Sequence, residues 1–63
     1  MLVRNRFPIE ICIDDNDTEF IIEANTLCEV LDEDPEDYVV QAVDKNLPQV
    51  HFSIFIDDSI IEE

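Results

Sequence analysis

Acidic residues fill the middle of this chain without any basic residue between them. From Phe7 to Asp44 the sequence contains thirteen Asp and Glu residues and no Lys or Arg, and the formal net charge is −14. Repulsion among so many carboxylates opposes a compact state. The apolar content is nevertheless 46%, whereas disordered acidic segments contain few apolar residues. We therefore expect a folded domain whose carboxylates form a solvated shell around an apolar core.

The length limits the chain to a single small domain. Its 63 residues make one domain at most, and we expect residues 57–63 to form a flexible acidic tail. Two cysteines, Cys12 and Cys28, are too few for a disulfide framework, so a homodimer or a bound partner is the expected source of extra stability. No signal-peptide pattern is present. We expect a cytoplasmic protein, located in the host cytoplasm if a phage encodes it.

Three segments alternate apolar and polar residues, which is the period of a half-buried strand. They are residues 6–13, 18–23 and 49–57. A polar turn joins the first two segments. In that turn Asn16 is the best candidate for a positive φ angle, because the chain contains no Gly and Asn tolerates that conformation. We expect the first two strands to form a hairpin.

The segment between the second and third strands predicts two helices. Thr26 to Glu29 matches a capping box at the start of a short helix. Pro35 suits the first position of a longer helix that runs to about Lys45, since Pro is tolerated there and not in the helix interior. The predicted fold is therefore α+β, in the order β-β-α-α-β. One short and one longer helix cover one face of a three-stranded antiparallel or mixed sheet.

No residue pattern indicates catalysis or a cofactor. The chain has one His, His51, and its lack of Gly excludes a P-loop, a dinucleotide fingerprint and a G-x-S-x-G motif. Asp15, Asp17 and Glu19 offer the oxygen ligands that Ca²⁺ and Mg²⁺ prefer, but the EF-hand pattern is absent, so we expect diffuse cation attraction without a metal site. The negative charge disfavours direct binding to nucleic acid or to an anionic membrane.

The acid distribution instead predicts a protein partner with a basic surface. Carboxylates at alternate strand positions lie about 6–7 Å apart, and duplex DNA carries one charge per roughly 1.7 Å of its axis. A folded array of acids can therefore imitate a short stretch of phosphate backbone and be drawn to a nucleic-acid-binding groove. The candidate contact residues are Asp14, Asp15, Asp17, Glu19, Asp32, Glu33, Asp34, Glu36 and Asp37.

In size and charge the chain is similar to small acidic inhibitors that phages encode against host defence or nucleic-acid enzymes, many of which mimic DNA. The resemblance implies an inhibitor, encoded by a phage or mobile element, that blocks a host nucleic-acid-binding or defence protein. It shares no motif and therefore implies no site residues. The alternative is a homodimeric interaction or adaptor module whose acids serve solubility. Its apolar interface would comprise Ile21, Val40, Phe55, Ile60 and Ile61.

Overall fold

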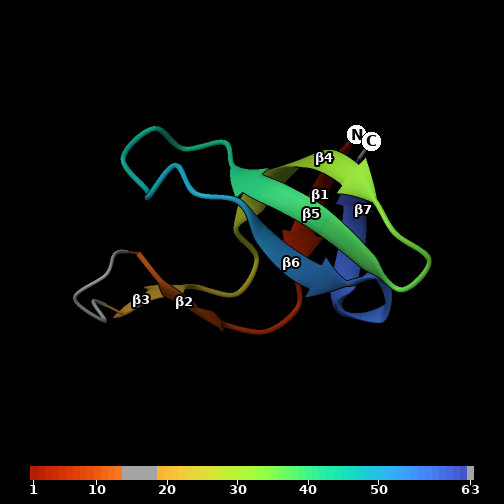
Figure 1. The fold of residues 1–63 in the computed structure, drawn as a ribbon, viewed down its shortest axis with the longest axis horizontal. Coiled ribbons are helices and arrows are strands. Elements are labelled where there is room, and N and C mark those ends of the chain that lie inside the picture. The colour runs from red at the N-terminus through yellow and green to blue at the C-terminus, as the bar shows by residue number, and fades with distance from the viewer. Residues whose placement is uncertain (14–18, 63) are drawn as a thin grey trace.

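The computed structural model describes residues 1–13 and 19–62 and is built almost entirely of strands. Five strands form an antiparallel sheet in the order β6-β5-β4-β1-β7, and β2 and β3 form a separate hairpin (Figure 1). The elements are β1 (Leu2–Asn5), β2 (Ile9–Cys12), β3 (Glu19–Ile22), β4 (Leu27–Glu33), β5 (Asp37–Ala42), β6 (Phe52–Phe55), the 3₁₀ turn η1 (Ile56–Asp58) and β7 (Ser59–Glu62). The predicted α+β fold is therefore wrong, because the described residues contain no α-helix.

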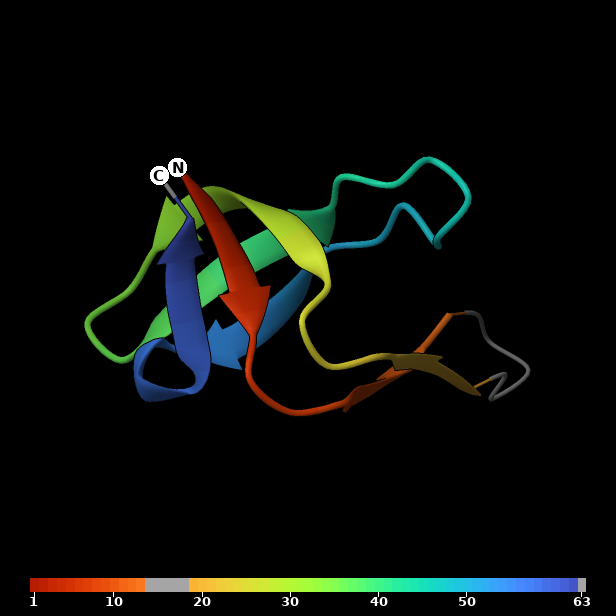
Figure 2. The ribbon, with the colours of Figure 1, turned by 180° about the vertical axis from the view of Figure 1, so that it is seen from behind.

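The five-stranded sheet must curl strongly. β6 and β7 stand at opposite ends of the strand order, yet only η1 connects them. Four chain steps across η1 span at most about 14 Å, whereas the outer strands of a flat five-stranded sheet lie about 19 Å apart. The sheet closes this gap by curling, so that one of its faces is concave. Figure 2 shows the curled sheet from behind.

The core lies within this curl, and the hairpin helps to cover it. Burial alternates along β5, where Tyr38, Val40 and Ala42 are buried and the residues between them are half-buried. Ile11 and Ile22 of the hairpin join the same cluster. The cluster consists of Val3, Ile11, Ile22, Cys28, Tyr38, Val40, Phe52 and Ile54. Because both the sheet and the hairpin contribute to it, they share one core.

Both predicted helices are strands in the structure. The capping-box segment that begins at Thr26 leads into β4, and the longer helix is replaced by β5. Pro35 lies in the turn between these strands, where the Asp34 N–H donates to the Asp37 carbonyl (2.8 Å). The physical reason is pairing: β5 lies between β4 and β6, and both neighbours satisfy its backbone groups. Its Tyr-Val-Val sequence also suits a strand.

The segment expected to be a flexible tail contributes to the sheet. Over residues 57–62 it completes η1 and forms β7, which pairs with β1 from Leu2↔Glu62 to Asn5↔Ser59. The buried Ser59 hydroxyl donates to the Ile56 carbonyl at 2.7 Å, which closes η1 at its end. The sequence pattern did not predict β1, so the partner strand of this segment was not predicted either.

The predicted hairpin is present, as β2 and β3 with Ile9 opposite Ile22, and the third predicted strand is present as the shorter β6. Asn16 lies outside the described residues. Among the described residues, the positive φ angle belongs to Asn25 (67°), in the turn that leads from β3 to β4. The described part of the chain contains no helix with the length and apolarity needed to cross a membrane.

Asn5 fixes the hairpin to the sheet. Its side chain is 1% exposed, and its Nδ2 donates to the carbonyls of Phe7 (2.8 Å) and Glu23 (3.0 Å). Its Oδ1 accepts from the Thr26 N–H (2.9 Å). These partners lie where the chain leaves the sheet toward the hairpin and where it returns. One buried side-chain amide therefore fixes both connections between the hairpin and the sheet.

Candidate protein-binding surface

Two acidic segments that are far apart in the sequence meet at one end of the sheet. One segment comprises the end of β4, the β4–β5 turn and the start of β5, and η1 carries the other segment. The Ile56 N–H donates to the Glu36 carbonyl at 2.9 Å, which fixes η1 beside the turn. We call these carboxylates the acidic end. It consists of Asp32, Glu33, Asp34, Glu36, Asp37, Asp57 and Asp58.

Most carboxylates of the acidic end are exposed to water. Asp37 and Asp58 are half-buried, and the others are exposed. Within the described residues, one ion pair forms, between Arg4 Nε and Glu62 Oε2 (3.2 Å), and it lies outside the acidic end. The carboxylates of the acidic end are therefore left without a basic side chain as an ion-pair partner in the described part of the chain, and their charge is free to act on a partner.

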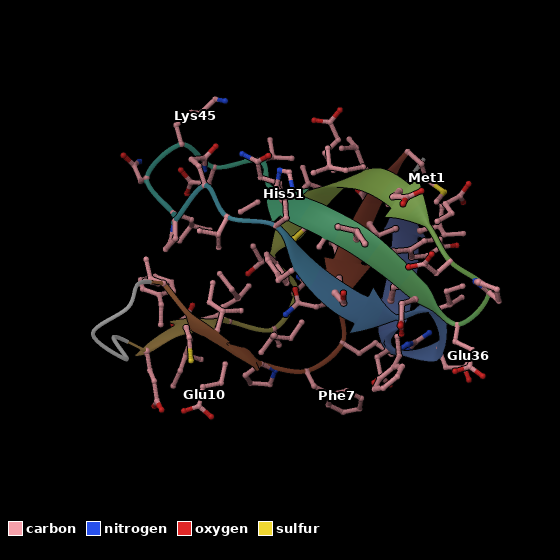
Figure 3. All side chains as sticks on the ribbon, in the orientation of Figure 1. Met1, Phe7, Glu10, Glu36, Lys45 and His51 are labelled. Carbon is pink, nitrogen blue, oxygen red and sulfur yellow. The ribbon has the colours of Figure 1, made fainter. Side chains whose placement is uncertain are left out.

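One basic residue of the chain itself lies beside the acidic end. The Arg6 N–H donates to the Asp58 carbonyl at 2.8 Å, which places the Arg6 backbone against η1, and the Arg6 side chain is exposed. The other cation outside the ion pair, Lys45, lies in the loop between β5 and β6. Figure 3 shows it well away from Glu36.

Two exposed phenylalanines adjoin the acidic end. Phe7 is 60% exposed and Phe55 is 62% exposed. Together with Asp58 they line a groove of about 240 Å³, which we call the phenylalanine groove. Phe55 and Asp58 also line a second hollow of about 480 Å³ with Pro35 and Glu36. The apolar groove is therefore continuous with the charged surface, because both hollows share Phe55 and Asp58.

Glu19 is the one predicted contact acid of the hairpin that lies within the described residues. Asp14, Asp15 and Asp17 lie outside the described residues. Glu19 on β3 lies near Glu10 on β2; a hydrogen bond between their carboxyl groups and the negative charge of Glu10 raise the pKa of Glu19. Figure 3 shows Glu10 and Glu36 toward opposite ends of the long axis of the molecule. Among the described contact acids, Glu19 therefore lies apart from those of the acidic end.

The predicted apolar interface does not form one surface. Val40 was expected on an exposed helix face, but it is 0% exposed and lies in the core, because it belongs to an inward-facing position of β5. Ile21 lines a groove of about 640 Å³ with Leu27 and Val43, beside the loop between β5 and β6. Phe55 lines the hollows at η1 instead.

Ile60 and Ile61 lie on the edge strand β7 and are 40% and 53% exposed. Asp58 precedes this strand, and Glu62 at its end pairs with Arg4. The edge strand is short, with four residues, and it leaves two apolar side chains in water.

Sequence reasoning missed three residues of this surface as members of one site. Asp57 and Asp58 were expected in a flexible tail, and Phe7 was expected within the strand of residues 6–13 because it continues the alternation of Ile9 and Ile11. The structure ends that alternation at Ile9, where β2 begins. The adjacent Pro8 lacks an N–H and suits a position before the strand. The Phe-Pro dipeptide was the available signal that the strand begins after Pro8 and that Phe7 lies outside it.

His51 and possible metal ligands can be placed within residues 1–13 and 19–62. His51 is exposed and precedes β6, and these ranges hold no group of three or more His, Cys, Asp or Glu side chains placed to hold a metal ion. Comparisons with protein-family models, curated protein sequences and solved structures found no match.

Proposed function

We propose that this protein is a small acidic inhibitor that covers the basic surface of a host nucleic-acid-binding or defence protein. The observation that carries the proposal is the meeting of the β4–β5 turn with η1, joined by the hydrogen bond from Ile56 to Glu36. It brings two acidic segments together at one end of the sheet and places Glu36 beside Asp57 and Asp58. A surface of this kind attracts a partner that presents Lys and Arg side chains toward phosphate groups.

The charge would act first on the rate of association. A net charge of −14 on 63 residues produces a long-range field that steers a basic partner, and such steering weakens as salt is added. Once the partner is bound, individual exposed pairs stabilise the complex by about 0.2–1 kcal/mol each. Tight binding therefore needs several pairs at once, and an assembled acidic surface offers them.

The role we propose is binding without catalysis or a cofactor, in the cytoplasm of the host of a phage or mobile element. The support is the same surface, because its exposed carboxylates suit a macromolecular partner. Imitation of DNA charge is the mode of binding that fits this surface, because the phosphate-binding side chains of the partner would meet carboxylates in place of phosphates.

A homodimer is the second candidate. The exposed Ile60 and Ile61 on edge strand β7 favour it, since an edge strand can pair with a second copy. Sedimentation analysis at high salt, where charge repulsion is screened, tests this candidate. A concentration-dependent dimer that Ile61→Lys abolishes would support it, and a monomer at every concentration would exclude it.

The test of the proposed inhibitor starts from captured partners. The tagged protein is incubated with a bacterial lysate and eluted with a salt gradient, and each partner is then challenged with duplex DNA. We expect a nucleic-acid-binding protein that salt releases and that DNA displaces. Partners that survive high salt and ignore DNA would contradict the proposal.

A further inference from the structure

The phenylalanine groove has a composition that the acidic surface alone does not require. Phe7 and Phe55 are the two most exposed large apolar side chains among the described residues, at 60% and 62%. Both line one groove, although they come from different parts of the chain. Leaving two aromatic rings in water forgoes the stabilisation that their burial would bring to so small a domain.

The charge around the groove indicates the chemistry of its occupant. Asp58 lines the groove itself, and it also lines the adjoining hollow with Asp57 and Glu36. An apolar aliphatic side chain from a partner would gain nothing from these carboxylates. A cation that also stacks on aromatic rings would use both features.

We infer that the phenylalanine groove binds an arginine side chain of the partner's basic surface, with the guanidinium against the rings of Phe7 and Phe55 and beside Asp58. The inference rests on the proposed function, since it names the side chain that the acidic end selects. Arginine fits better than lysine because its planar guanidinium stacks on aromatic faces and is weakly hydrated, whereas the ammonium group of lysine is compact and strongly hydrated.

The chain's own Arg6 does not fill this role in the structure. Its backbone lies against η1 through the hydrogen bond to the Asp58 carbonyl, but its side chain is exposed and it does not line the groove. The groove is therefore accessible to an arginine from another molecule.

The test compares two labelled peptides, hexa-arginine and hexa-lysine, by fluorescence anisotropy against the full chain. The measured quantity is the ratio of the two dissociation constants at one salt concentration. We expect the wild-type protein to prefer hexa-arginine. Phe55→Leu should reduce this preference about two- to fivefold, which is the effect of losing one exposed cation–π contact. Phe55→Tyr keeps an aromatic face and should retain the preference.

One control variant and one further groove variant separate the groove from general effects. Ile21→Ala removes an exposed apolar side chain from the other groove and should leave the preference unchanged. Phe7→Leu provides a second, independent test of the same groove. Both phenylalanines are largely exposed, so we expect their variants to fold, and circular dichroism checks this.

The outcomes distinguish this inference from the proposed function. If both peptides bind with salt-dependent affinity but Phe55→Leu and Phe7→Leu leave the preference unchanged, the arginine inference is overturned and the acidic surface still stands. If neither peptide binds at low salt, both are overturned. A reduced preference in both Leu variants, with hexa-lysine binding unaltered, supports the inference.

Discussion

Removing the side-chain amide of Asn5 should destabilise the whole protein. Asn5→Ala deletes the two hydrogen bonds to the Phe7 and Glu23 carbonyls and the one from the Thr26 N–H. It leaves those three backbone groups without a hydrogen-bond partner at a buried site, since Asn5 is 1% exposed. Neither Asn nor Ala favours a strand, so backbone propensity changes little.

The expected loss follows from the number of hydrogen bonds. Each contributes about 0.5–1.5 kcal/mol, and leaving a buried partner unpaired costs at least as much. Three bonds therefore correspond to about 3 kcal/mol. A chain of 63 residues has a total stability of roughly 3–9 kcal/mol at 0.05–0.15 kcal/mol per residue. The substitution would remove a third or more of the stability, and the melting temperature would fall by about 4–8 °C for each kcal/mol.

The assay is urea unfolding followed by circular dichroism and by the fluorescence of the buried Tyr38, which is the only Tyr in a chain without Trp. Asn46→Ala is the matched control, because Asn46 is exposed in the loop between β5 and β6, and it should change stability by less than about 0.5 kcal/mol. If Asn5→Ala were as stable as this control, the role assigned to Asn5 in attaching the hairpin would be refuted.

Three further predictions concern charge and the core. The raised pKa of Glu19 means that the folded state binds the Glu19 proton more tightly than the unfolded state, so this contribution to stability is present below the ordinary pKa of Glu and is lost as pH rises through the raised value. Glu19→Gln should therefore raise the melting temperature at pH 7 and flatten the pH dependence of the melting temperature. An unchanged pH profile would contradict the pairing with Glu10. Arg6→Gln should strengthen binding of hexa-lysine, because Arg6 is a positive charge that lies beside η1. Lys45→Gln makes the same charge change in a distant loop and should have a smaller effect on this binding. Equal effects would show that only net charge matters. Val40→Ala should lower the free energy of unfolding by about 2 kcal/mol, since it removes buried methyl groups and leaves a cavity, and a loss below about 0.5 kcal/mol in urea unfolding would argue against its place in the core.

The hairpin of β2 and β3 could be predicted because its residues show one period only. Ile9 and Ile11 alternate with polar residues, and Asp and Asn follow them at the turn. No helical period fits this stretch, so the strand assignment had no competitor.

The region of β5 could not be assigned in this way, because its residues satisfy two periods. Tyr38, Val39, Ala42 and Val43 form a helical stripe, whereas Tyr38, Val40 and Ala42 form one face of a strand. Pro35 is equally suited to the start of a helix and to a turn. Tertiary pairing with β4 and β6 decided between these alternatives, and that pairing is not visible in a local pattern.

The strands β1 and β7 are too short to show a period. Each has four residues, and each is stabilised by the other. Their pairing joins the two ends of the described chain, which a local analysis of either end cannot detect. Asp57 and Asp58 were therefore read as parts of a tail, although the curl of the sheet places them beside Glu36.

The candidate surface was predictable in its charges and not in its arrangement. The acids of the β4–β5 turn were expected in a solvated shell and are exposed, and Phe55, expected in an apolar interface, is exposed as well. The contact between the two acidic segments depends on the strand order. Phe7 was expected within a strand because the boundary between loop and strand, at Ile9, cannot be read from alternation alone.

The most direct measurement compares two triple variants that change the net charge equally. One neutralises the acidic end (Glu33→Gln, Glu36→Gln and Asp57→Asn), and the other neutralises exposed acids elsewhere (Glu10→Gln, Glu23→Gln and Glu29→Gln). Their affinities for a captured partner are measured at one salt concentration, so long-range steering changes alike in both. At roughly 0.5 kcal/mol for each lost pair, the first variant should bind about tenfold more weakly than the second. Equal affinities would show that the acidic end is not the binding surface.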